Sequence, residues 1–251
     1  MRQHVRKLIP PPATDDPVFM AVTRKLRKIH PGRMQQSVGE IAEFYRLAKQ
    51  SKARTYLEVG CASGASLYIM AHALAEPGLV CGINLDGEIT REWRDGEYNQ
   101  LRTDAVPVDV ARAARDPRLT AIAANLTAEG YTVLIIDGNS HDTTVMDQAR
   151  AFFGEAGVDV CFLDGDDDLA GARLDWNIYA PLVNRGGLIG LHDIATRCKG
   201  WGPTRRRFGV RLLWAEILKI TRTRQWNMRP QEKGIGVALV PRHDEPRWWV
   251  I

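Results

Sequence analysis

The chain has 251 residues, a length that suits one large domain or one domain with additions. Its hydrophobic content of 45% is that of a packed globular protein, and its net charge is +4. No apolar run reaches the roughly 18 residues that a membrane-spanning helix needs, and the N-terminus lacks the apolar stretch of a secretory leader, so we expect a soluble, cytoplasmic chain with no membrane span. The four cysteines share no C-x-x-C spacing, which argues against a zinc or disulfide framework.

Charge is distributed unevenly along the chain. Residues 1–33, 34–196 and 197–251 carry net charges of +6, −11 and +9. An acidic central part is compatible with cation binding, and basic flanks could attract phosphate or nucleic acid. Because no basic run is interleaved with aromatic side chains for base stacking, a solvated surface is the simpler interpretation and we expect no nucleic-acid partner.

The N-terminal segment 1–35 is basic and rich in proline, and this composition predicts an arm or a loose helix ahead of a main domain at 36–251. A helix is expected to begin after Ser37, which we predict as its N-cap. Its apolar positions follow the stripe of one helix face, at Ile41, Phe44, Tyr45 and Ala48.

Apolar strands and amphipathic helices then alternate along the chain. We expect strands at 55–59, 79–85, 132–136, 158–163 and 188–191, with helices between them that begin near residues 65, 119, 143 and 169. Strands separated by helices indicate a parallel sheet, and their continuous apolar character indicates that both faces are covered. After Gly209 we expect a helix, then strands at 223–228 and 235–240. We therefore predict a doubly wound α/β fold: a Rossmann-like, seven-stranded, mostly parallel sheet with a C-terminal antiparallel hairpin.

The stretch at about 86–117 interrupts this alternation. Strand-to-helix connections usually span about 2–6 residues, so this segment is an insertion. Trp93 and Tyr98 stand among its charges, which is compatible with a lid over a binding site. A surface insertion with a short helix of its own around Val110 is an equally good interpretation.

Two of the expected strands end in groups that can bind a metal ion. The strand at 158–163 is followed by Asp164, and the strand at 188–191 by His192 and Asp193. In an open α/β sheet, ligands bind at the carboxyl ends of the strands. We therefore predict a divalent metal site formed by Asp164, His192 and Asp193. Carboxylate oxygens favour Mg²⁺, whereas an imidazole ligand would shift the preference toward Mn²⁺, Fe²⁺ or Zn²⁺.

The segment Glu58–Gly64, which follows the first strand and opens a helix, is a run of small residues. Small side chains at positions 60, 62, 63 and 64 would let a ligand approach the backbone, and a helix N-terminus offers unpaired N–H groups. The run is neither G-x-G-x-x-G nor a P-loop. A nucleotide-like ligand is the natural occupant, although a plain tight turn would explain one of the glycines.

Three later motifs accompany the loop at Glu58–Gly64. They are Asp137–Asp142, Phe162–Asp167, and Gly186-Gly187 with Leu191–Asp193. The loop resembles the first motif of class I S-adenosylmethionine-dependent methyltransferases. The later motifs narrow the resemblance to the cephalosporin-hydroxylase-like, or methyltransferase 24, group, which is related to metal-dependent catechol O-methyltransferases and macrolide-sugar O-methyltransferases. The resemblance covers about residues 36–240.

The resemblance implies that S-adenosyl-L-methionine is the cofactor and assigns residues to it. Gly60 and Gly64, with Ala62 and Ser63 between them, would line its methionine part, and Glu58 would hold the loop or the amino group. Asn84 stands where relatives usually have an acid that binds the ribose hydroxyls, and Asp86 follows two residues later. Asp164 would face both the cofactor and the metal.

Ser140 and His141 match the turn that contacts the adenine in these enzymes. For His141 the alternative is a helix N-cap neighbour that touches no ligand. The two interpretations differ in whether the imidazole faces the binding site.

The resemblance also implies a divalent metal, Mg²⁺ above all, which would bind an acceptor hydroxyl, lower its pKa and align it with the methyl sulfonium. Relatives usually read Asp-Gly-Asp-His after the fourth strand, whereas this chain has Asp167 in place of the histidine. Crowded carboxylates raise one another's pKa, so an acid here could act as the general base or bind a second cation. Alternatively, Asp167 and Asp168 cap the helix that follows. Our candidate catalytic residues are Asp164, Asp167 and His192.

These features predict an O-methyltransferase for a hydroxylated small molecule, such as a sugar or a natural-product scaffold. A second hypothesis is methylation of a lipid-linked or polymeric glycan, because the basic tails could meet an anionic carrier. A third is a cofactor-binding homologue without catalysis, which Asn84 and Asp167 suggest. A homodimer is also conceivable, with Trp248 and Trp249 as candidate interface residues.

Overall fold

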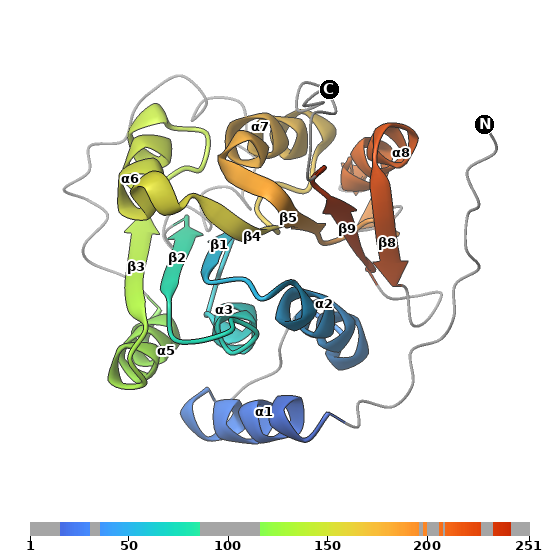
Figure 1. Ribbon diagram of the computed structural model, residues 1–251. Coiled ribbons are helices and arrows are strands. Elements are labelled where there is room, and N and C mark those ends of the chain that lie inside the picture. Colours follow the sequence, from blue (N-terminus) through green and yellow to red (C-terminus); the bar gives the residue numbers. More distant parts are fainter. Residues whose placement is uncertain are drawn as a thin grey trace.

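A seven-stranded sheet with the order β3-β2-β1-β4-β5-β9-β8 forms the centre of the molecule (Figure 1). The computed structural model describes residues 16–30, 36–85, 116–195, 198–199, 206–207, 209–226 and 233–241. The strands of the sheet are β1 (Thr55–Val59), β2 (Leu79–Asn84), β3 (Thr132–Asp137), β4 (Val158–Leu163), β5 (Val183–Leu191), β8 (Arg222–Trp226) and β9 (Ile235–Leu239). Two short strands, β6 (Cys198–Lys199) and β7 (Arg206–Arg207), pair separately.

The strands β3, β2, β1, β4 and β5 pair in parallel, whereas β9 is antiparallel to both β5 and β8. This confirms the predicted fold, a mostly parallel Rossmann-like sheet with an antiparallel C-terminal pair. The last strand in sequence, β9, lies inside the sheet and β8 forms its edge. The sequences explain this arrangement, since IGVAL is apolar and mostly buried, whereas the charged RTRQW suits an edge exposed to water.

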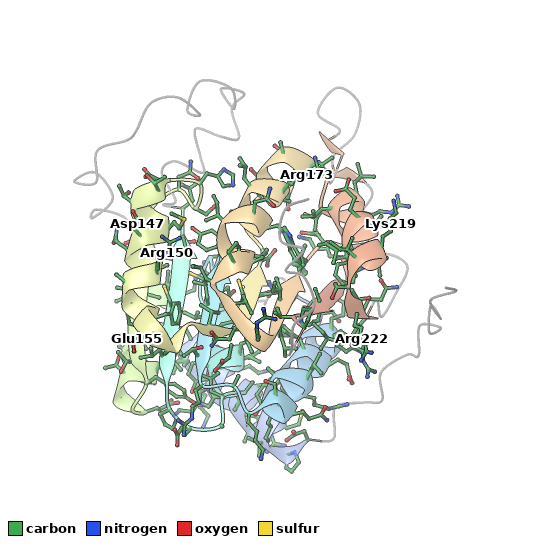
Figure 2. The ribbon with its side chains drawn as sticks, turned by 45° about the horizontal axis from the view of Figure 1, so that its top comes forward. Asp147, Arg150, Glu155, Arg173, Lys219 and Arg222 are labelled. Carbon is green, nitrogen blue, oxygen red and sulfur yellow. The ribbon has the colours of Figure 1, made fainter. Side chains whose placement is uncertain are left out.

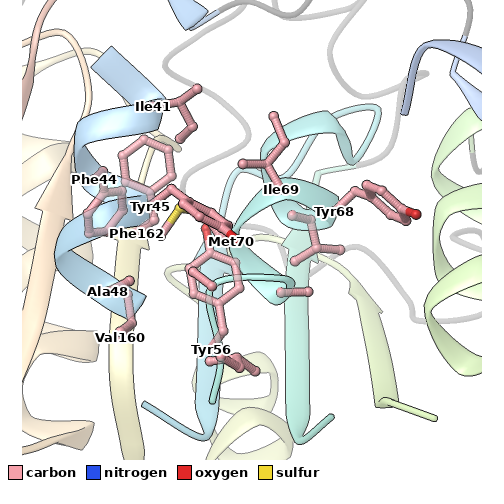
Figure 3. Packing of buried hydrophobic residues seen from close by; sticks show 14 of the residues in the cluster. Ile41, Phe44, Tyr45, Ala48, Tyr56, Tyr68, Ile69, Met70, Val160 and Phe162 are labelled. Carbon is pink, nitrogen blue, oxygen red and sulfur yellow. The ribbon is translucent and has the colours of Figure 1, made fainter. Parts of the chain in front are cut away.

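Helices cover both faces of the sheet (Figure 1). One face carries α2 (Val38–Ser51), α3 (Ala65–Ala71) and α5 (Pro117–Ala128), and the other carries α6 (Thr143–Phe153), α7 (Leu169–Tyr179) and α8 (Val210–Ile220). Each face has its own hydrophobic cluster. The cluster under α2 and α3 contains Phe44, Tyr45, Tyr56 and Phe162, all fully buried (Figure 3). Ser37 is the N-cap residue of α2, but its side chain makes no capping hydrogen bond.

Part of the predicted N-terminal arm is a helix that packs against the domain. Helix α1 (Pro17–Ile29) begins at the N-cap Asp16, whose carboxylate accepts hydrogen bonds from the backbone N–H groups of the first turn. Its buried side chains include Phe19, whose ring centroid lies 5.3 Å from that of Tyr45. The helix contacts α3 and α5 (Figure 1). This packing places His30, the C-cap residue of α1, within hydrogen-bond distance of Ser63 in the loop after β1.

Several sequence hypotheses lie outside the described residues. The lid hypothesis concerns residues 86–115, including Asp86 and Trp93, which are outside the described part of the chain. The interface hypothesis concerns Trp248 and Trp249, which are outside it as well. No helix in the described part of the chain is long and apolar enough to cross a lipid bilayer.

A buried carboxyl group lies in the central strand β1. The side chain of Glu58 is fully buried, and its oxygens accept hydrogen bonds from the Tyr56 hydroxyl at 2.8 Å and from Ser66 Oγ at 2.5 Å. Burial raises the pKa of Glu58 to about 8, and the negative charge of Asp164 adds to the rise, although the two hydrogen bonds oppose it. The carboxyl group is therefore mostly protonated at neutral pH.

This burial predicts a pH-dependent stability. The folded protein keeps a proton on Glu58 that the unfolded chain releases above its ordinary pKa of 4.5. The contribution of Glu58 to the free energy of unfolding is therefore complete below that value and falls as the pH rises toward 8, by on the order of 4 kcal/mol. We expect Glu58→Gln, which cannot titrate, to flatten this part of the dependence in urea unfolding between about pH 5 and pH 8.

Glu155→Gln, at an exposed position in the turn between α6 and β4, is the matched control and should leave the wild-type dependence unchanged (Figure 2). A Glu58→Gln variant with the same pH dependence as the wild type would contradict the assignment.

Candidate cofactor and metal site

A cavity of about 290 Å³ opens at the carboxyl ends of the parallel strands. It lies where the strand order reverses between β1 and β4, the usual ligand position in doubly wound sheets. Five strand ends and two further segments contribute to its wall. The lining residues are Val59–Ser63, Ala65, Ser66, Ile83–Leu85, Gly138–His141, Asp164–Asp167, Asp193, Gln36 and Lys233.

The loop after β1 has an unusual backbone. Gly60 and Gly64 both have a φ of +84°, and Ala62 has a φ of +45°, a conformation that costs a residue with a Cβ about 1 kcal/mol or more. A Cβ on Gly60 would lie 2.1 Å from the backbone oxygen of Asp164, and one on Gly64 would lie 2.9 Å from Leu119 Cδ1. Close packing against the backbone of Asp164 therefore requires glycine at position 60, whereas at position 64 the left-handed backbone is the main reason for glycine. Gly60, Ala62 and Ser63 line the cavity, whereas Gly64 is not among the lining residues.

Glu58 lies beneath this loop and is not among the cavity-lining residues. Its contact with the loop runs through Ser66, whose hydroxyl donates to Glu58 and whose residue does line the cavity. The structure therefore places Glu58 as a support of the loop.

The ends of β2 and β3 form the opposite wall. Asn84 lines the cavity, and its carbonyl accepts a hydrogen bond from the Gly138 N–H at 2.9 Å. Ser140 Oγ donates to Asp175 Oδ1 at 2.7 Å, and Nε2 of His141 lies 3.2 Å from the same oxygen, at an ion-pair distance. Burial disfavours the charged imidazole, but the carboxylates of Asp175 and Asp166 raise the pKa of His141 above its ordinary value.

His141 also stands beside a helix cap, as the alternative interpretation supposed. The N-cap of α6 is Asp142, whose carboxylate accepts a hydrogen bond from the Thr144 N–H at 2.9 Å. His141 lines the cavity as well, so its place next to a helix cap does not exclude the contact with the adenine, which stays a prediction.

The predicted metal ligands come together at the ends of β4 and β5. One potential ligand atom from each of Asp164, His192 and Asp193 lies within 4.8 Å of the others. Nδ1 of His192 lies 2.8 Å from Asp164 Oδ1 and 3.4 Å from Asp193 Oδ2. His192 and Asp193 are both about 1% exposed, and Asp193 has a φ of +62°. Burial disfavours the charged form of His192, but the charge and hydrogen bond of Asp164 raise its pKa.

This donor set fits a divalent cation. Two carboxylates and one imidazole match the ligand types of Mg²⁺ and Mn²⁺ sites. In addition, Nε2 of His192 is a buried polar atom without a hydrogen-bond partner among the described residues.

The acidic run after β4 divides into different roles. Asp168 is the N-cap of α7 and accepts a hydrogen bond from the Gly171 N–H at 2.8 Å, so the cap interpretation holds for Asp168. Asp166 accepts one from the Asp168 N–H at 3.0 Å, and burial above all raises its pKa. Asp167 is exposed and lines the cavity.

Three polar residues that the sequence did not point to also reach this site. Gln36 Nε2 donates to Asp164 Oδ2 at 2.5 Å, and Lys233 Nζ lies 3.1 Å from Asp193 Oδ2. His30, at the end of α1, makes a 2.8 Å hydrogen bond between its Nε2 and Ser63 Oγ. All three lie outside the motifs, and no local pattern in the sequence marks them.

Comparison with known proteins identifies the family. The model of the family described as a methyltransferase domain, methyltransferase 24, matches residues 57–194, which is more than half of the chain. No curated protein matches the chain. Among solved structures, the O-methyltransferase from Bacillus cereus in complex with SAH shares 17% identity, with a TM-score of 0.56 and coverage of 90% of this chain and 91% of that chain.

A second structure, the O-methyltransferase TomG from Streptomyces achromogenes, involved in tomaymycin synthesis and solved in complex with SAM, shares 16% identity, with the same coverage and TM-score. At these identities the two likenesses concern the fold. The family match itself runs from β1 to the end of β5 and so includes the loop after β1 and the Asp164–His192–Asp193 cluster. The chain belongs to the methyltransferase 24 family of methyltransferase domains.

Proposed function

We propose that the protein is an S-adenosylmethionine-dependent O-methyltransferase that acts on a hydroxyl group of a small molecule with the help of a divalent cation. One observation carries the proposal. A single cavity joins the loop after β1, which resembles the first motif of class I methyltransferases, to the edge of the Asp164–His192–Asp193 cluster. A methyl donor and a hydroxyl bound near the cluster would thus share one space, as direct transfer between them requires.

The cavity wall offers suitable groups along its whole length. Ser63 and Ser66 line the wall where the polar methionine end of the cofactor would lie, with their hydroxyls oriented by His30 and Glu58, and Asn84 can hydrogen-bond a ribose diol. Ser140 and His141 would face the adenine, held in place by their contacts with Asp175. Asp164 would lie between the cofactor and the acceptor.

Asp164, His192 and Asp193 would hold the cation, with Mg²⁺ as the first candidate. When bound, such an ion lowers the pKa of an acceptor hydroxyl and orients its oxygen. Gln36 bonds to one oxygen of Asp164 and His192 bonds to the other, so this carboxylate is held in one orientation before any ligand binds. Asp167 is our candidate general base, because it lines the cavity and is accessible to solvent.

Titration calorimetry with S-adenosylhomocysteine, with and without Mg²⁺, tests the proposal directly. We expect binding in both conditions. Absence of binding in both would overturn the methyltransferase assignment. Binding without turnover on any hydroxylated acceptor would favour a homologue that binds the cofactor without catalysing methyl transfer.

Asn84→Ala tests the ribose contact. Loss of one hydrogen bond to a ligand hydroxyl costs about 1 kcal/mol, so we expect S-adenosylhomocysteine to bind about fivefold more weakly. The control is Asn125→Ala on α5, where the amide bonds only within its own helix. An unchanged affinity in Asn84→Ala would remove Asn84 from the cofactor site.

Asp164→Asn tests the cation site, because it keeps the shape of the side chain and removes its charge. We expect Mn²⁺ to bind at least about tenfold more weakly in calorimetry, since a charged ligand of a hard cation is lost, with turnover falling as well. The affinity for S-adenosylhomocysteine should change little. Asp147→Asn, with a side chain 65% exposed on α6, is the matched control (Figure 2). Wild-type affinity for Mn²⁺ in Asp164→Asn would exclude Asp164 as a ligand.

A further inference from the structure

Lys233 places a positive charge beside the Asp164–His192–Asp193 cluster. Its Nζ lies 3.1 Å from Asp193 Oδ2, and the residue lines the cavity with its side chain 33% exposed. The backbone of Lys233 is anchored nearby, because its carbonyl accepts a hydrogen bond from the Ala195 N–H at 2.8 Å. Both ends of this lysine are thus tied to the turn that follows β5. The family match ends at residue 194 and does not extend to Lys233.

The carboxylates of the cluster are already engaged by protein donors. Asp164 accepts from His192 on one oxygen and from Gln36 on the other. Oδ2 of Asp193 accepts from Lys233. A divalent ion at the cluster would bind oxygens of these same carboxylates, and its charge would repel the ammonium group beside Asp193.

We propose that Lys233 is a built-in cation that competes with the divalent ion for Asp193. In the metal-free protein its ammonium group compensates a carboxylate that is 2% exposed, and metal loading requires it to leave Asp193 for the open cavity. The inference rests on the metal site of the proposed function. It predicts that this lysine lowers the affinity of the site for metal, so that the ion remains exchangeable.

The test is Mn²⁺ titration by calorimetry on the full chain. We expect Lys233→Met to bind Mn²⁺ about tenfold more tightly than the wild type, since the competing charge is gone; this corresponds to about 1.4 kcal/mol. Lys233→Arg, which keeps the charge, should show no such gain. Lys219→Met causes the same loss of charge at an exposed position on α8, and should leave the affinity within about twofold of the wild type (Figure 2).

The inference is overturned if Lys233→Met binds Mn²⁺ no more tightly than the wild type does. It is also overturned if Lys219→Met gains as much Mn²⁺ affinity as Lys233→Met, because the gain would then be an effect of net charge. If the methionine variant does not fold, Lys233→Gln gives the same readout. The affinity for S-adenosylhomocysteine, measured on the same samples, distinguishes a failure of the Lys233 inference from a failure of the proposed function. Cofactor binding without the gain in Mn²⁺ affinity removes only the role of Lys233, whereas a wild-type protein that does not bind S-adenosylhomocysteine removes the proposed function.

Discussion

The close backbone contact between Gly60 and Asp164 is the constraint on which the site depends. These residues directly follow the neighbouring strands β1 and β4, and the Asp164 N–H donates to the Val59 carbonyl at 2.9 Å. A side chain on Gly60 would occupy the position of the Asp164 backbone, so only glycine lets the two strand ends continue side by side. The contact places the loop after β1 against Asp164, the first residue of the Asp164–His192–Asp193 cluster.

The helices that follow β1 and β4 lie on opposite faces of the sheet, which leaves space above the two strand ends. After β1 the chain enters α3 on one face of the sheet, and after β4 it enters α7 on the other (Figure 1). The strand ends stay together while the helices separate, and the cavity occupies the space between them. The same topology explains why side chains from five strand ends meet, although the ends of β1 and β5, at Val59 and Leu191, are 132 residues apart in the sequence.

The fold could be predicted from sequence wherever the signal is local. β1 and β4 have the predicted bounds because each is a continuous apolar run between turns. β5 begins five residues earlier than predicted, because Val183–Gly187 contains polar residues and glycines that do not resemble a buried strand. The place of β9 between β5 and β8 could not be predicted, since a local pattern gives a hairpin but not the strand against which the hairpin packs.

The same distinction applies to the site. Asp164, His192 and Asp193 could be found because they follow apolar strands, and strand ends converge. Gln36, Lys233 and His30 could not, because a single polar residue has no periodicity and reaches the site only through tertiary packing. His30 depends on the docking of α1, whose apolar face is visible in the sequence but whose partner is not.

Three acids lie near the ends of β1, β4 and β5, and the negative charge of each is compensated in a different way. Two of the unpredicted residues, Gln36 and Lys233, take part in this compensation. Glu58 is fully buried and holds a proton, Asp164 receives two hydrogen bonds, and Asp193 faces an ammonium group. A buried carboxylate without such a partner would be costly. Burial is the main cause of the raised pKa of Glu58, and the charge of Asp164 adds to it, so the protonation of the acid beneath the loop after β1 depends in part on the charge of the neighbouring cluster. The support of this loop and the Asp164–His192–Asp193 cluster are therefore electrostatically coupled.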